Sequence, residues 1–286
     1  MNYAALIQNR KSVREFRDKV VPFQTLEKIK DYYRRSVRRL IPGIGTELYF
    51  FGTDAREALE GAAGYNSFLV GAPQYLVLLS EEHPHAHLNA GFVMEDLILK
   101  LTELDLGSCW VTFADSDAVK EALGIESELE VAAIAAFGYG VKTTRRLRLN
   151  IRSMSDIDIS AKRHYFEPKR SVSDLVHRNH WGSRDGLDSA IGFYDDMLWE
   201  SFYAASLAPS YLNRQAYGFL LEQGKVTLVS VPDKFNVPID MELSLGIVLH
   251  HFTVVSEDWA GKLSWQFDPQ GAELPEGHRA VAAAAI

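Results

Sequence analysis

One pattern occurs twice in this chain of 286 residues. Residues 91–110 and 246–265 each begin with glycine, continue as an apolar run, and reach tryptophan through a turn that contains glycine. Both runs are apolar on more than one side, and a helix of that kind requires burial all round. The repeat predicts two related halves whose long helices cross at a central interface, as in a symmetric dimer. The alternative is two unrelated core helices.

The first half alternates helices and strands. Its hydrophobic periodicity predicts helices over residues 22–40, 89–106 and 115–124. Asp115 or Ser116 caps the last of these, and Gly124 ends it. Short apolar runs predict strands over residues 47–52, 73–79, 108–113 and 131–137.

The second half repeats this order after a polar, basic crossover over residues 145–165. Its predicted elements are a helix over 187–207, a turn at Pro209, a hairpin of 219–222 and 226–231 joined at Gln223-Gly224, a helix over 239–259, and a short strand near Trp265. The alanine-rich tail from Arg279 is expected to fray. We therefore expect an α+β fold with intimately packed domains at residues 1–160 and 161–286.

Composition narrows the classes of function. Hydrophobic residues make up 47% of the chain, which is enough for a sizeable core. A net charge of −8 argues against general nucleic-acid binding, because phosphate contacts need a basic surface. The sole cysteine, Cys109, excludes an internal disulfide and fits a reducing cytosol. No apolar run reaches the roughly eighteen residues of a membrane span. These features predict a soluble cytoplasmic protein that binds neither nucleic acid nor membrane.

Two segments carry groups suited to ligand binding. Arg10, Lys11, Ser12 and Arg14 follow a short N-terminal helix. Guanidinium groups bind phosphate bidentately and a serine hydroxyl can complete the shell, although a basic run alone is more often solvated surface. Far downstream, residues 208–217 form a turn that carries hydroxyl and amide groups. Together the segments suggest a cofactor pocket between two halves.

These motifs resemble a known family. Arg10-Lys-Ser-Val-Arg-Glu-Phe16, Pro209-Ser-Tyr-Leu-Asn-Arg-Gln215 and Leu106-Gly-Ser-Cys-Trp110 together resemble the FMN-dependent nitroreductase family. Residues 123–140 look like that family's late strand and its Gly-Tyr ending. The resemblance covers residues 1–155 and, more weakly, 170–268. It is closest to the group whose chain fuses two nitroreductase-like halves into a pseudo-dimer.

The resemblance implies an FMN site built from both halves. The FMN phosphate and ribityl chain would be bound by Arg10, Lys11, Ser12 and Arg14. Arg146 and Arg148 would also bind the phosphate. The other half supplies Pro209, Ser210, Asn213 and Gln215, which flank the isoalloxazine ring and hydrogen-bond its polar edge. The strand from Gly107 and Ser108 towards Thr112 places backbone donors near flavin N5. Tyr211, Tyr217 and Trp110 are candidates to line the ring.

Only one complete set of the FMN-binding motifs is present in the sequence, so we expect one FMN per chain. Residues 42–48 stand where the Pro209 turn stands in the second half, but they lack its serine, asparagine and glutamine. Residues 175–181 are a poor counterpart of the Arg10 segment. We therefore expect a degenerate second pocket and a monomer that acts as an intramolecular pseudo-dimer.

The resemblance implies an FMN-dependent NAD(P)H oxidoreductase. It would reduce nitroaromatic, quinone or related small-molecule acceptors by ping-pong hydride transfer through flavin N5, with no catalytic side chain of its own. The alternative is a flavin- or ligand-binding protein without catalysis, a sensor or store derived from a nitroreductase. A purely structural domain would leave both segments unexplained.

Other chemistry-bearing residues favour simpler interpretations. The run from His83 to His87 is a proline-broken loop without partner motifs, so we expect surface histidines and no metal. His250 and His251 lie in an apolar helix and are expected to be satisfied core or interface histidines. Residues 138–140 lack the fingerprint of a dinucleotide site. Cys109 is expected to be buried packing.

Overall fold

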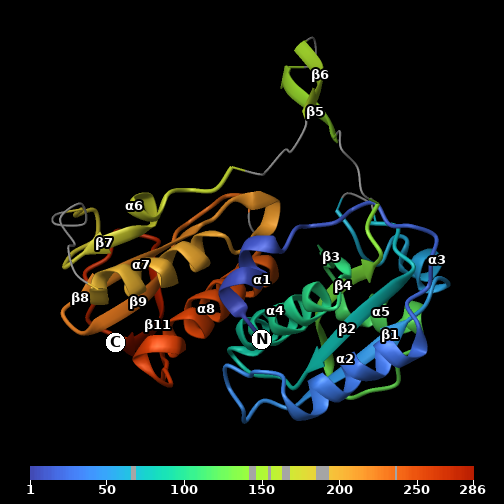
Figure 1. Ribbon diagram of the computed structural model, residues 1–286, viewed down its shortest axis with the longest axis horizontal. Helices are drawn as coiled ribbons and strands as arrows, with labels where there is room; N and C mark the ends of the chain where they lie inside the picture. Colours follow the sequence, from blue (N-terminus) through green and yellow to red (C-terminus); the bar gives the residue numbers. More distant parts are fainter. Residues whose placement is uncertain (66–68, 142–145, 154–155, 163–167, 185–192, 236) are drawn as a thin grey trace.

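The computed structural model describes residues 1–65, 69–141, 146–153, 156–162, 168–184, 193–235 and 237–286 (Figure 1). Two sheets lie on either side of a central pair of helices. Strands up to Gly138 form one sheet, and strands from Val176 onward form the other.

The first sheet is antiparallel, with strand order β1-β2-β4-β3. Its strands are β1 (Thr46–Phe51), β2 (Gln74–Ser80), β3 (Gly107–Val111) and β4 (Glu130–Gly138). Their positions confirm the four predicted strands. The central strands β2 and β4 are buried along nearly their whole length, which explains their continuous apolar runs.

Helices cover both faces of this sheet. α2 (Phe23–Arg35) and α4 (Ala86–Glu103) pack on Leu76 and Leu78 of β2. α3 (Ala55–Leu59) and α5 (Ser116–Leu123) pack on Tyr75 and Val77. Alternate residues of a strand point to opposite faces, so β2 contributes to two cores. At the ends of α5, the Asp115 side chain accepts from two backbone amides and Gly124 is left-handed, as predicted.

The second sheet has the order β10-β11-β9-β8-β7. Its strands are β7 (Val176–Arg178), β8 (Tyr217–Glu222), β9 (Lys225–Ser230), β10 (Gln266–Phe267) and β11 (Arg279–Ala285). Their core is shared with helices α6 (Val172–Leu175), α7 (Phe193–Ser206) and α8 (Pro238–Ala260). The predicted hairpin at Gln223-Gly224 and the predicted helix α8 are confirmed. Residues 187–192 of the predicted helix 187–207 lie outside the described residues.

The two sheets share one plan, so the chain is internally duplicated. The order β1-β2-β4-β3 corresponds to β8-β9-β11-β10, and every one of these pairings is antiparallel. Even an irregularity is repeated. The pairing of β2 with β4 shifts by one residue between Leu78 and Leu79 of β2. The pairing of β9 with β11 shifts in the same way between Leu228 and Val229 of β9.

The prediction that the tail frays is wrong. Residues 279–285 form β11, which lies between β9 and β10 and corresponds to β4 of the first half. Alanine has a low strand preference, so local sequence pointed away from a strand. The tail was recognisable by comparison, because both β4 and β11 are rich in alanine.

The expected crossover at residues 145–165 also has regular structure. β5 (Arg146–Ser153) and β6 (Asp156–Lys162) pair as an antiparallel hairpin. Figure 1 shows this hairpin standing apart from both sheets. The predicted crossover between the halves therefore contains a hairpin, which was not predicted from the sequence.

The two long helices cross at the centre, which confirms the prediction from the repeat. A Cβ at Gly91 of α4 would lie 2.3 Å from the Leu243 carbonyl oxygen, and a Cβ at Gly246 of α8 would lie 2.1 Å from that of Leu88. Each glycine therefore meets a carbonyl of the opposite helix at the corresponding position. Only glycine permits so close an approach.

Burial explains the apolar character of α8. By length and composition alone, α8 would qualify as a membrane span among the described helices, but most of it is buried inside the protein. It packs against α4 and α7. The short helix α1 (Tyr3–Asn9) lies across the junction, where Ile7 meets Leu99 of α4 and Val254 of α8.

Candidate functional site

The segment after α1 runs along the end of the first sheet. Ser12 forms a parallel bridge with Ser108 of β3, and the amide of Val13 donates to the Ser108 carbonyl at 2.8 Å. Further on, Phe16 bridges Gly140 just beyond β4. The predicted phosphate-binding segment and the predicted Gly107-Ser108 segment therefore lie side by side.

Two glycines make this close pairing possible. A Cβ at Gly107 would lie 2.7 Å from a methyl carbon of Val13, and one at Gly140 would lie 3.0 Å from another. Larger side chains would push the segment off the sheet. The close approach of Val13 therefore explains why both positions are glycine.

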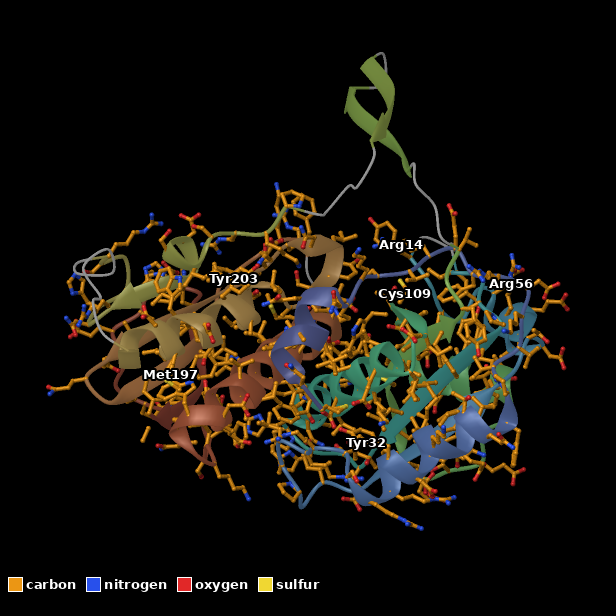
Figure 2. All side chains as sticks on the ribbon, in the orientation of Figure 1. Arg14, Tyr32, Arg56, Cys109, Met197 and Tyr203 are labelled. Carbon is orange, nitrogen blue, oxygen red and sulfur yellow. The ribbon has the colours of Figure 1, made fainter. Side chains whose placement is uncertain are left out.

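The cationic side chains of this segment differ in solvent exposure. The Arg10 side chain is only 8% exposed, its Nε has no hydrogen-bond partner, and it lies 3.6 Å from the Glu95 carboxylate. Arg14 and Lys11 are exposed, and Ser12 is half-buried. Burial raises the pKa of Cys109, while the charges of Arg14 and Arg10 oppose that effect. Figure 2 shows Arg14 and Cys109 near one another beside β3. Cys109 itself is buried, as expected.

The downstream turn has an unusual backbone. It includes the 3-10 turn η1 (Tyr211–Asn213). Leu212, Asn213 and Gln215 all have positive φ, at 48°, 56° and 48°. Such conformations cost on the order of 1 kcal/mol each for residues other than glycine, so surrounding contacts must hold them. One such contact is the Ser210 hydroxyl, which accepts from the Gln215 amide at 2.9 Å.

Gln215 holds the turn from inside. Its side chain is buried; its Nε2 donates to the Ser206 carbonyl and the Tyr217 hydroxyl, and its Oε1 accepts from the Arg170 amide. Both amide hydrogens are therefore used within the protein. A hydrogen bond from Gln215 to a flavin ring stays a prediction. Tyr217 is buried as well, with its hydroxyl on the Ala205 carbonyl, so it packs in the core rather than lining a ring.

Asn213 is joined to a residue that the sequence did not single out. Lys169 donates to the Asn213 side-chain oxygen at 2.7 Å and to the Ala208 carbonyl at 2.8 Å. The Asn213 amide nitrogen donates to the Pro168 carbonyl. Lys169 therefore places a cationic group at the turn. Its only sequence signal is its position just before Ser171, which caps α6.

Contacts across the halves connect this turn to the far end of β3. The Tyr211 ring meets the Tyr65 ring edge-on at 6.2 Å between centroids. Next to Tyr65, the Gly64 amide donates to the Thr112 carbonyl at 2.7 Å. The Arg10 segment and the Pro209 turn thus lie towards opposite ends of one strand, about 13 Å long for its five residues.

Two predicted site residues are not brought to this strand. Arg146 and Arg148 lie in β5, in the hairpin that stands apart in Figure 1. Their side chains are outside the described residues, so their role at the phosphate stays a prediction.

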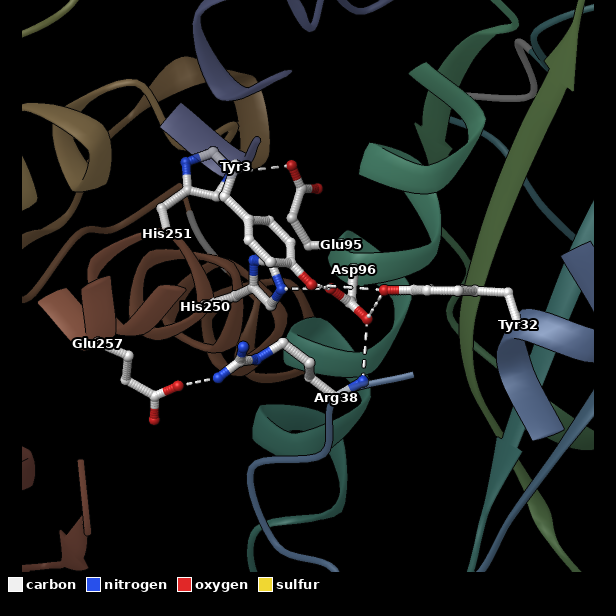
Figure 3. Close-up of polar contacts among 8 residues, drawn as sticks. All are labelled: Tyr3, Tyr32, Arg38, Glu95, Asp96, His250, His251 and Glu257. Carbon is white, nitrogen blue, oxygen red and sulfur yellow. Dashed lines mark hydrogen bonds and ion pairs between the residues drawn. The ribbon is translucent and has the colours of Figure 1, made fainter. Parts of the chain in front are cut away.

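Behind the Arg10 segment lies a buried polar network at the crossing of α4 and α8 (Figure 3). Glu95 and Asp96 of α4 face His251 and His250 of α8, and all four side chains are fully buried. Trp110 donates from Nε1 to Glu95. The histidines are satisfied interface residues, as predicted, apart from Nδ1 of His250, which has no partner.

Two hollows lie on the described surface. One, of about 560 Å³, adjoins the phosphate-binding segment and is lined by Leu6, Asn9, Val13, Thr102, Glu103, Asp105, Leu106, Gly107, Gly140 and Val141. The other, of about 370 Å³, lies in the loop between β10 and β11. Neither is lined by Arg10 or Asn213. The case for a cross-half site therefore rests on the two segments that flank β3.

Comparison with known proteins agrees with this architecture. A protein of Thermotoga maritima with a nitroreductase description matches at 19% identity and a TM-score of 0.58, covering 100% of this chain and 94% of that one. A nitroreductase family protein of Clostridium novyi matches 49% of this chain and 87% of its own at 21% identity and a TM-score of 0.43. An FMN-dependent nitroreductase of Clostridium difficile matches 48% of this chain and 87% of its own at 20% identity and a TM-score of 0.39.

No curated protein matches the chain. The family described as "Putative TM nitroreductase" matches residues 2–256, nearly the whole length. The chain therefore belongs to this nitroreductase family.

Proposed function

We propose that the protein is an FMN-dependent NAD(P)H oxidoreductase that reduces nitroaromatic, quinone or related acceptors. Family membership supports nitroreductase chemistry in general. The observation that carries the cofactor proposal is the buried Arg10 Nε, which has no hydrogen-bond partner although its segment is paired with β3. An unpartnered buried donor is costly, so it indicates a group that is bound there in the working protein.

The residues fit a phosphate. Arg10 offers a guanidinium already fixed by packing, Ser12 offers a hydroxyl, and Arg14 adds an exposed positive charge. Phosphate oxygens favour such charge-assisted donors. Lys11 adds to the local positive potential.

The other half would contact the remainder of the cofactor. When bound, FMN would supply the redox chemistry, taking hydride from NAD(P)H and passing reducing equivalents to the acceptor. Pro209 and Ser210 would lie against the ring, and Asn213 would contact its edge if it exchanged Lys169 for the ligand. Gln215 would keep the turn in its left-handed conformation. The backbone between Ser108 and Thr112 would face the reactive side.

The first prediction tests the phosphate contact. Arg10→Ala is expected to weaken FMN binding by at least tenfold, since a charge-assisted contact contributes about 1.5–3 kcal/mol. Flavin absorbance titration of protein freed of bound flavin measures this. Arg17→Ala, an exposed guanidinium whose backbone lies on the same edge, is the matched control and should leave affinity unchanged.

Activity separates the proposal from its alternative. Anaerobic NAD(P)H should bleach the flavin bands, and a quinone or nitroaromatic should restore them. Flavin that binds but is not reduced by either nicotinamide would favour a non-catalytic sensor or store. Failure to bind FMN at all would exclude both the oxidoreductase and a flavin-binding sensor or store.

A further inference from the structure

Two carboxylate–imidazole pairs lie at the crossing of α4 and α8. Glu95 Oε1 and His251 Nε2 are 2.9 Å apart, and Asp96 Oδ1 and His250 Nε2 are 3.0 Å apart. Glu95 corresponds to His250 and Asp96 to His251 in the repeat, at the same offset that relates Gly91 to Gly246. The duplication therefore maps one pair onto the other, while their surroundings differ (Figure 3).

The Glu95–His251 pair has a determined proton count. His251 Nδ1 lies 3.0 Å from the Ala204 carbonyl, which can only accept, so Nδ1 carries a hydrogen. Between Nε2 and Glu95 a second proton is needed, because otherwise two acceptors would face each other without one. Burial lowers the pKa of His251 and the Glu95 carboxylate opposes this, so the proton belongs to the pair rather than to one residue. With both protons in place the pair has no net charge.

This neutrality leaves Arg10 with an uncompensated charge. Both oxygens of Glu95 have closer donors than Arg10, namely His251 at 2.9 Å and Trp110 at 3.1 Å, whereas Arg10 Nε is 3.6 Å away. The buried positive charge is then available to an anion. A carboxylate without its imidazole would instead capture the guanidinium.

The second pair, Asp96 and His250, has different neighbours. His250 Nε2 faces the Asp96 carboxylate, whereas His250 Nδ1 has no hydrogen-bond partner. Burial raises the pKa of Asp96, but the hydrogen bond and electrostatic attraction of His250, together with hydrogen bonds from the Arg38 amide and Tyr32, outweigh it, so the pKa lies below its usual value. The Arg38 guanidinium contacts Glu257. The guanidinium on this side of the crossing is therefore already paired with a carboxylate.

We propose that His251 is a positioning residue for the phosphate site: it neutralises Glu95 and so leaves Arg10 to bind a flavin phosphate monoester. At the corresponding pair, Asp96 and His250, the neighbouring Arg38 guanidinium is held by Glu257, so that side does not offer a second such site. This inference rests on the proposed function and names the residue that makes its site select phosphorylated flavin.

The test compares FMN with riboflavin, which differ in the phosphate. Protein freed of flavin is titrated with each, and the ratio of the two affinities is the readout. His251→Gln should lower this ratio about tenfold or more, because Glu95 then pairs with Arg10. Adding Glu95→Gln should restore the ratio to within about threefold of the original protein, since the competing charge is gone. His250→Gln is the matched control and should leave the ratio unchanged.

Several outcomes would overturn the proposal. It fails if the double variant stays as low as His251→Gln, if both flavins weaken equally, or if His250→Gln has the same effect. Should circular dichroism show His251→Gln to be unfolded, Glu95→Gln alone decides: the ratio is retained here, whereas it falls if Glu95 orients Arg10. Original protein that binds neither flavin refutes the proposed function itself, whereas FMN preference insensitive to His251→Gln refutes only this inference.

Discussion

Asp240 is a buried carboxyl in the first turn of α8, close to Tyr211 of the candidate turn. Burial raises its pKa from 3.8 to about 6. An acid whose pKa is higher in the folded state stabilises the fold at low pH, and that contribution is lost as pH rises through the folded pKa. Asp240 should therefore destabilise the protein at neutral pH.

Asp240→Asn should remove this penalty. At pH 7.5 we expect the free energy of unfolding of the variant to exceed that of the original protein by about 2 kcal/mol. This difference should shrink towards zero near pH 4. Urea unfolding at a series of pH values measures it. A difference that stays constant with pH would show that Asp240 does not titrate in this way.

The helix crossing depends on two glycines. Gly91 and Gly246 each lie against a carbonyl oxygen of the opposite helix, at distances that no Cβ could occupy. Neither helix can move away without opening the core, because both are buried nearly all round. Close contact also brings Glu95 within reach of His251.

Gly246→Ala should destabilise the protein by roughly 1–3 kcal/mol or more, since the methyl group meets backbone rather than a flexible side chain. Thermal unfolding by circular dichroism measures the loss. Gly52→Ala is the control, because nothing lies within 4 Å of its Cβ position and its φ is not left-handed. Equal melting temperatures for the two variants would refute the close crossing.

At the scale of the whole molecule, the two halves share their central helices and pack as one structure. α4 and α8 serve both cores, and Leu88 and Phe92 of α4 lie in the core of the second sheet. The last strand, β11, lies between β9 and β10. The hairpin β5–β6, by contrast, pairs only with itself among the described strands.

Removal of residues 279–286 should therefore prevent folding of the second half. The loss exposes β9 and β10 together with the apolar face of α8, so we expect insoluble or unfolded protein by circular dichroism. Replacement of residues 146–162 by a short glycine–serine linker is the control and should keep the melting temperature. A truncated chain that melts like the original would restore the frayed-tail prediction.

Some of this protein could be predicted from residues that act locally or recur. The glycine-to-tryptophan spacing identified the duplication and the central crossing, because the same packing problem is solved twice with the same residues. Periodicity located the main strands of the first sheet and the two long helices. The motifs at Arg10 and Pro209 indicated the nitroreductase family.

Other features depend on contacts between distant segments, and only the tertiary structure decided them. Strand β11 forms because β9 and β10 are there to pair with it, although its alanines have little strand preference. Gln215 holds its turn because three groups from elsewhere converge on its amide. His251 and His250 are alike in sequence, yet one meets a carbonyl and the other meets none, because burial and hydrogen bonding depend on what the fold places beside each ring.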